Sequence, residues 1–174
     1  MSKALSDLGC YETYFLIYLN GDSEVAGEGY YRVDGDCFFL AIADQEVYGD
    51  GVERYSINHT QREVVLERVV NDGSQPLLII NPAVAFLKLA EEFDVEEQTE
   101  GLNNNSTELK LTPKSEDNIL QSSLLSIDNE TYLPKSISYR VDEEEVSIIL
   151  LDIRAAKEVI EISYPSDYEV IDIR

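Results

Sequence analysis

The fold is decided by one stretch of the chain, which reads Asn81-Pro82-Ala83-Val84-Ala85-Phe86-Leu87-Lys88-Leu89-Ala90-Glu91-Glu92-Phe93. Asn81 can cap the first amides of a helix, and Pro82 suits the first helical position. The acidic pair at 91–92 lies away from the apolar residues, which predicts an amphipathic helix over 81–93. Most of the other segments follow a strand pattern. The simplest architecture is therefore a curved antiparallel sheet with this helix against its concave face.

Alternating apolar and polar residues fill the sequence before this helix, and Gly, Asp and Asn mark the turns. The predicted strands of this part are 11–19, 25–33, 37–42, 46–48, 52–57 and 62–70. Their short connections predict consecutive antiparallel neighbours.

A second series of strand patterns follows the helix. The acidic segment 94–100 is predicted to be extended, and further strands are predicted around Leu109 and Leu111 and at 119–127, 136–141, 146–153 and 168–174. Nine or ten strands with one helix exclude a doubly wound fold. We predict a mainly β (α+β) chain that forms a single domain, 1–174, in which a large curved sheet makes a half-barrel with a short lid helix.

Composition limits the classes of partner. The 174 residues are 44% hydrophobic, which suits one globular domain. Asp and Glu number 35 against 13 Lys and Arg, and the net charge of -22 repels phosphate backbones and anionic membrane surfaces. We therefore expect no nucleic-acid partner. The longest apolar stretch, 77–90, is interrupted by polar residues and too short to span a bilayer, so we expect no transmembrane segment.

The N-terminal residues contain no apolar core of a signal peptide. The expected location is periplasmic if a leader has been removed ahead of this sequence, and cytoplasmic otherwise. Cys10 and Cys37 fall on different predicted strands, where independent small apolar residues are the favoured interpretation. A disulfide between them in an oxidising compartment remains the alternative.

Short motifs occur in a characteristic order along nearly the whole chain. They are Gly35-Asp36-Cys37-Phe38, Asp50-Gly51 with Tyr55, Arg62-Glu63-Val64, Asn81-Pro82, Leu111-Thr112-Pro113-Lys114, Leu133-Pro134-Lys135 and Tyr168-Glu169-Val170-Ile171-Asp172-Ile173-Arg174. This order resembles that of the periplasmic lipoprotein carrier (LolA-like) family, especially its Bacteroidetes-type members. The resemblance implies a half-barrel, lidded by helices, that holds lipoprotein acyl chains between the inner and outer membranes. It also implies an inner-membrane transporter that delivers the cargo and an outer-membrane acceptor.

The resemblance bears on the lid as well. It implies that Asn81-Pro82 opens a lid helix that places Val84, Phe86 and Leu87 near the mouth of the cavity. Members of the family usually begin with an amphipathic helix, but only ten residues precede Tyr11 here. We therefore expect that part of the lid to be absent, or to lie ahead of this sequence.

The sheet pattern supplies candidates for the cavity lining. Burial of an acyl chain is favourable by roughly 0.8 kcal/mol per methylene, so apolar contacts alone can hold a long chain. The candidates share the apolar side of their predicted strands, and the alternative is that they form an ordinary core. The strand residues predicted to bind lipid are Phe15, Ile17, Leu19, Tyr31, Phe38, Leu40, Ile42, Tyr55, Val64, Leu66, Ile137, Tyr139 and Ile148.

Catalytic and metal-binding patterns are weak. His59 is the one histidine and lies in an Asn-His-Thr turn, where a solvated loop residue is a better interpretation than a catalytic base. Neither cysteine belongs to a CxxC motif, and the acidic turn 142–145 lacks the spacing of a calcium loop. We expect no catalysis, cofactor or metal.

Two functions remain from different classes. The favoured one is a non-enzymatic periplasmic carrier that binds the acyl chains of lipoproteins, or another lipid, for transfer to the outer membrane. The alternative is a half-barrel protein-interaction module with a filled core, whose acidic surface binds a basic protein.

Overall fold

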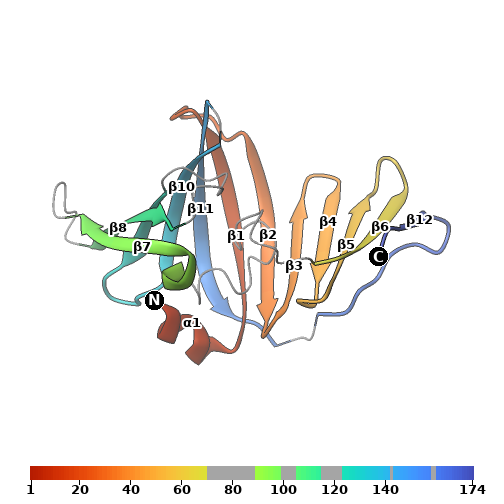
Figure 1. Ribbon diagram of the computed structural model, residues 1–174, viewed down its shortest axis with the longest axis horizontal. Coiled ribbons are helices and arrows are strands. Elements are labelled where there is room, and N and C mark those ends of the chain that lie inside the picture. The colour runs from red at the N-terminus through yellow and green to blue at the C-terminus, as the bar shows by residue number, and fades with distance from the viewer. Residues whose placement is uncertain (70–88, 99–104, 115–122, 142, 158–159) are drawn as a thin grey trace.

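The computed structural model describes residues 1–69, 89–98, 105–114, 123–141, 143–157 and 160–174. Its strands form one large, open, curved sheet that does not close into a barrel (Figure 1). The described elements are α1 (Ser2–Leu8), β1 (Cys10–Leu19), β2 (Gly27–Asp34), β3 (Cys37–Ile42), β4 (Gln45–Gly49), β5 (Glu53–Asn58), β6 (Glu63–Arg68), β7 (Phe93–Gln98), β8 (Ser106–Pro113), β9 (Ser123–Asp128), β10 (Pro134–Val141), β11 (Glu144–Ala155) and β12 (Glu169–Asp172). The predicted mainly β half-barrel is confirmed.

The strand order places the first strand near the middle of the sheet. The order is β12-β6-β5-β4-β3-β2-β1-β11-β10-β9-β8-β7, so one meander from β1 to β6 and another from β7 to β11 meet where β1 pairs with β11. The strand pairs that the structure describes are antiparallel, except that β12 runs parallel to β6. The sheet is therefore antiparallel as predicted, except at the edge formed by the C-terminal strand β12. The parallel pairing of β12 with β6 departs from the prediction.

The residues before β1 form a helix, and the expectation that this part of the lid is absent is wrong. α1 spans seven residues, and its Leu5 is only 1% exposed. Gly9 follows with a φ of 69°, a conformation that costs glycine little, and it turns the chain directly into β1. The short helix is held by the burial of Leu5, because a single helix of this length is not stable in water alone.

The end of the predicted helix over 81–93 is also found. Residues 89–92 are helical, and Phe93 begins β7. Leu89 and Phe93 are both buried, as the predicted apolar side requires. Residues 81–88, with Val84, Phe86 and Leu87, lie outside the described residues.

The ends of the strands are set by the backbone conformation at the turns rather than by the alternation of apolar and polar residues. The bounds of β3 agree with the predicted strand 37–42. By contrast, Arg62 has a positive φ of 59° and ends the turn after β5, so β6 begins at Glu63 rather than at residue 62. Two strands also begin earlier than the predicted 136–141 and 146–153, because Pro134 and Glu144 already belong to β10 and β11.

The register assigns every paired side chain to one of two faces. Directly paired residues on neighbouring strands point to the same side of a sheet. Phe15 pairs with Gly29, and Phe38 pairs with Gly49, so these four residues share one face. Arg54 pairs with Gly49 and belongs to this face too, which places its neighbour Tyr55 on the other.

Each face carries its own apolar cluster. We call the face with Phe15 and Phe38 the helix face, because Leu5 of α1 and Leu89 pack in its cluster. The opposite side is the tail face, because side chains of the C-terminal segment, among them Tyr164 and Tyr168, pack there against buried residues of β4, β5 and β6. The sheet is thus apolar on opposite sides at its two ends.

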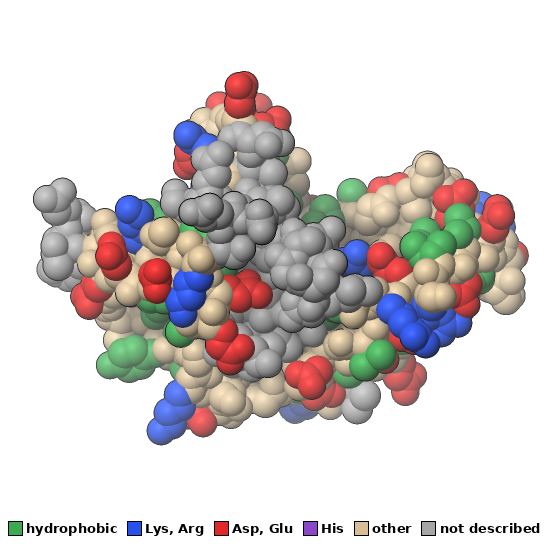
Figure 2. Space-filling model, in the orientation of Figure 1, with side chains coloured by type: hydrophobic (Ala, Val, Ile, Leu, Met, Phe, Trp, Pro, Cys, Tyr) green, Lys and Arg blue, Asp and Glu red, His purple; other side chains and the backbone are tan. Residues whose placement is uncertain are grey.

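Charged side chains cover the outside of the molecule. Figure 2 shows carboxylates scattered over the described parts of the visible face, with lysine and arginine side chains among them. Several of these form ion pairs, such as Arg54 with Glu67 at 2.7 Å and Arg154 with Glu12 at 2.9 Å. On this face the described carboxylates are spread out rather than gathered in one patch.

Candidate functional site

The helix face carries the largest apolar surface of the described residues. Its centre is buried, with Leu111 and Leu125 at most 1% exposed, while residues around this centre are only partly buried. Nine of the residues predicted to bind lipid belong to this cluster. They are Phe15, Ile17, Tyr31, Phe38, Leu40, Ile42, Ile137, Tyr139 and Ile148.

The other predicted residues lie elsewhere. Leu19 is half-buried at the end of β1 and is not part of the cluster. Tyr55, Val64 and Leu66 belong to the tail-face cluster. These three were predicted to share one surface with Phe38, and the register places them on the opposite face, so they line no common cavity with it.

The sequence analysis missed several residues of the helix-face cluster. Leu109, Leu125 and Ile127 have the same strand parity as Ile137 across β8, β9 and β10, and extension of the alternation along these strands finds them. Leu5 had no such signal, because seven residues are too few for a helical period to be convincing.

Glycines let two aromatic rings lie flat on the helix face. A Cβ at Gly29 would overlap the ring of Phe15, and a Cβ at Gly49 would overlap the ring of Phe38. Both rings are buried. The glycines on the neighbouring strands therefore leave the space that the rings of Phe15 and Phe38 occupy on this face.

Four hydroxyl groups lie on the buried part of this face, those of Tyr11, Thr13, Tyr31 and Ser123, and the Ser123 hydroxyl has no hydrogen-bond partner among the described residues. Thr13 donates its hydroxyl to the carbonyl oxygen of Leu151 at 2.7 Å. The hydroxyls of Tyr11 and Tyr31 are buried and have no hydrogen-bond partner among the described residues. Burial raises the pKa of both tyrosines well above the usual value of 10.0, so both keep their protons at neutral pH.

The tail face carries a row of aromatic rings across β1 to β4. The ring centroids of Tyr14 and Tyr30 are 5.1 Å apart, those of Tyr30 and Phe39 are 6.0 Å apart, and those of Phe39 and Tyr48 are 4.6 Å apart. A shallow groove of about 840 Å³ is lined by Tyr14 and Tyr30 of this row and extends to Leu151 of β11. Its one charged lining residue is Glu28.

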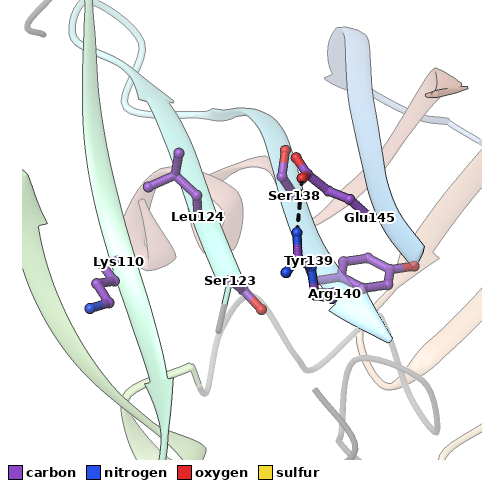
Figure 3. Close-up of a pocket in the computed structure, with 7 residues that line it drawn as sticks. All are labelled: Lys110, Ser123, Leu124, Ser138, Tyr139, Arg140 and Glu145. Carbon is purple, nitrogen blue, oxygen red and sulfur yellow. Dashed lines mark ion pairs between the residues drawn. The ribbon is translucent and has the colours of Figure 1, made fainter. Parts of the chain in front are cut away.

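A second, more polar pocket lies over β8 to β10 (Figure 3). It has a volume of about 460 Å³ and is lined by Lys110, Ser123, Leu124, Ser138, Tyr139, Arg140 and Glu145. Arg140 and Glu145 form an ion pair at 3.8 Å, so these two charges already neutralise each other. The lining is less suited to hydrocarbon than the helix face.

His59 contacts two other parts of the chain through its ring nitrogens. Its Nδ1 lies 2.9 Å from the Tyr168 hydroxyl oxygen, and its Nε2 lies 3.4 Å from a carboxylate oxygen of Glu46. The ring thus connects the turn after β5 to the C-terminal segment. Cys10 and Cys37 are not joined by a disulfide in the structure. Across the described ranges, no group of three or more His, Cys, Asp or Glu side chains is arranged to hold a metal ion.

No helix in the described part of the chain is long and apolar enough to cross a membrane. No family model matches the sequence, and no curated relative matches it. Solved structures do resemble the fold. An uncharacterized conserved protein from Thermus thermophilus gives a TM-score of 0.60 at 10% identity and covers 98% of both chains.

Two further structures extend this likeness. A putative outer membrane lipoprotein-sorting protein domain from Vibrio parahaemolyticus gives a TM-score of 0.51 at 10% identity, covering 92% of this chain and 91% of that one. MucB gives 0.50 at 17% identity, and the match covers 98% of this chain and 64% of MucB. At these identities the likeness concerns the fold. The chain shares the open, curved fold of a lipoprotein-sorting domain.

Proposed function

We propose that this protein is a non-enzymatic carrier, of the LolA-like and Bacteroidetes type, that binds lipoprotein acyl chains or another lipid on its helix face. The carrier works in the periplasm, receives cargo from an inner-membrane transporter and passes it to an outer-membrane acceptor. The observation that supports this proposal most is the partly buried apolar rim of the helix-face cluster, which includes Ile17, Leu40 and Ile42. The fold shared with a lipoprotein-sorting domain supports it too.

The chemistry of the rim suits hydrocarbon. Aliphatic side chains that are only partly covered gain free energy when a ligand removes the rest of their surface from water, at about 25 cal/mol per Å². An acyl chain contributes roughly 0.8 kcal/mol per buried methylene in the same way. Binding of this kind needs no catalytic group, and the proposal assigns none.

The test is a titration with an environment-sensitive apolar dye, followed by displacement with a triacylated lipopeptide. Leu40→Glu places a carboxylate on the helix face, and Tyr14→Glu places one on the tail face, where Tyr14 is 55% exposed. We expect wild type and Tyr14→Glu to bind the dye and release it to the lipopeptide, and Leu40→Glu to lose binding. Loss in Tyr14→Glu alone would move the ligand to the tail face. A folded wild-type protein that binds neither probe would refute the carrier.

The alternative function, a protein-interaction module, is favoured by a different observation. The net charge of -22 and the exposed groove beside Glu28 would suit a basic, partly apolar partner. In this case the helix-face cluster is a filled core, and the dye titration gives no saturable binding with a folded protein. Binding of a basic amphipathic peptide that is abolished by Glu28→Lys would then support the module.

A further inference from the structure

The two buried tyrosine hydroxyls on the helix face are the feature that the proposed function leaves unused. Tyr11 is 4% exposed and Tyr31 is 6% exposed, and within the described residues neither hydroxyl has a hydrogen-bond partner. Folded proteins pair nearly all buried polar groups, because an unpaired one has lost its water and gained nothing in return. Two such groups in one cluster therefore need an explanation.

The hydroxyls belong to neighbouring positions. Tyr11 pairs with Val33, and Tyr31 lies two residues before Val33 on β2, so the tyrosines are diagonal neighbours on one face. In antiparallel pairs such positions are roughly 7–8 Å apart, within reach of long aromatic side chains. The electrostatic influence of Tyr11 on Tyr31 agrees with this proximity.

Other hydroxyls of the central strands are satisfied by the protein itself. Thr13 lies between the two tyrosines on the same face and donates to the Leu151 carbonyl oxygen. Ser138 and Ser147 pair with each other at 2.8 Å across β10 and β11. Thr13 and Ser138 thus find partners, whereas the buried hydroxyl of Ser123 on β9 and those of the two tyrosines do not. The two tyrosine hydroxyls are the ones that lie next to each other.

The protonation state defines what a partner must offer. Since burial raises the pKa of both tyrosines, each hydroxyl remains a donor at neutral pH. The missing group is therefore an acceptor on an otherwise apolar ligand. A carbonyl oxygen fits, because it accepts two hydrogen bonds without carrying a charge, whereas a carboxylate would have to be stripped of its water.

We propose that the hydroxyls of Tyr11 and Tyr31 donate hydrogen bonds to the carbonyl oxygen of an acyl ester, whose hydrocarbon chain lies on the apolar rim of the helix face. This inference rests on the proposed carrier function and adds the class of cargo. The ligand is an esterified acyl chain that enters with its carbonyl group, rather than a bare hydrocarbon. The site lies at the α1 end of β1, since Gly9 alone separates α1 from that strand.

The experiment compares two probes in the dye-displacement assay: a lipopeptide with two palmitoyl ester chains, and its dialkyl ether analogue of equal chain length, which lacks the carbonyl oxygens. Palmitate is the third probe and represents the free acid. The variants are Tyr11→Phe, Tyr31→Phe and the double variant. Tyr18→Phe is the matched control, because Tyr18 is a tyrosine of the same strand as Tyr11 but lies on the tail face, outside both apolar clusters.

Wild type should bind the ester about tenfold more tightly than the ether, a ratio that one or two net hydrogen bonds provide. The double Phe variant should bind both equally, and Tyr18→Phe should keep the preference for the ester. The thermal midpoint of the double variant without ligand should equal or exceed that of wild type, because the removed hydroxyls were unpaired. Wild type could instead bind palmitate more tightly than the ester, with this preference lost in the double variant. That result would leave the hydrogen bonds to a carbonyl oxygen in place but would overturn the assignment of an ester as the ligand.

Two other results overturn the inference in different ways. Equal affinity for ester and ether in wild type would refute the carbonyl contact and leave the carrier intact. Absence of saturable binding of all three probes to the folded protein would refute the carrier, and the inference with it.

Discussion

Gly29 shows how a single missing methyl group keeps the central strands together. A Cβ here would lie on the ring of Phe15 and only 2.6 Å from the carbonyl oxygen of Ala41, which belongs to the neighbouring strand and cannot move freely. We predict that Gly29→Ala destabilises the protein by about 1–3 kcal/mol, the usual cost of an overpacked site. Urea unfolding measures this cost as a lower midpoint.

Gly27 provides the matched control for this substitution. It lies on the same strand and face, but its Cβ would be 3.6 Å from Ile17 Cδ1, an ordinary contact. Gly27→Ala should therefore leave the midpoint unchanged or raise it slightly, because alanine restricts the unfolded chain. Equal losses in both variants would contradict the assigned position of the Phe15 ring.

The alternation of residues within a strand predicts which side chains share a face of that strand. It does not predict how the faces of neighbouring strands match. The alternation correctly groups Val64 with Leu66, and the structure buries both on one side. Which side faces the helix depends on how β4 pairs with β5, and a shift of one residue there would exchange the two faces. The sequence contains no marker for this register, so these residues were placed on the wrong surface.

At the scale of elements, α1 depends on one side chain. Leu5 is 1% exposed and belongs to the helix-face cluster, whereas Leu8 is half-buried at its margin. We predict that Leu5→Ala costs about 2–4 kcal/mol in the free energy of unfolding, within the range for buried leucines. Leu8→Ala should cost clearly less. Similar losses for both variants, measured by urea unfolding, would mean that α1 does not dock through Leu5.

The C-terminal strand β12 is fastened by charged groups. Hydrogen bonds from Arg174 lower the pKa of Asp172 to about 2, and Arg174 also pairs with Glu53 at 2.8 Å. Because the folded-state pKa lies below the usual 3.8, this pairing stabilises the fold fully above that pH and loses its effect as the pH falls towards 2.

We therefore predict that Asp172→Asn lowers the thermal midpoint at pH 7 and that its difference from wild type shrinks as the pH is lowered from about 4 to 2. Asp22→Asn, which removes the same charge from the turn after β1, is the control and should show no such trend. A difference for Asp172→Asn that stays constant down to pH 2 would contradict the role of its carboxylate.

Elements differ in how well they can be predicted. β3 is framed by turn residues on both sides, and its bounds were found from sequence. α1 is too short to show a period, and β12 carries no sign of whether its partner runs parallel or antiparallel. Strand existence is a local property, whereas docking and direction depend on contacts far away in the sequence.

At the scale of the whole molecule, the net charge of -22 sets the response to salt. Repulsion among exposed carboxylates opposes the folded state, and salt screens it, since the Debye length falls from roughly 30 Å at 0.01 M to about 8 Å at 0.15 M. We predict that the thermal midpoint rises over this range. Sodium and potassium chloride should act alike, and a falling midpoint would mean that ion pairs such as Arg54 with Glu67 dominate.

The position of the C-terminal strand also has a consequence for synthesis. β4 to β6 leave the ribosome early, but the side chains that cover their apolar tail face come from residues 160–168, and β12 completes the edge after that. At about 5–20 residues per second, these strands wait roughly 5–20 s with Ile57 and Val64 uncovered. During that time the nascent chain exposes an apolar surface and an unpaired strand edge, which favour aggregation. A chaperone that binds the chain until the last residues emerge would raise the yield of folded protein.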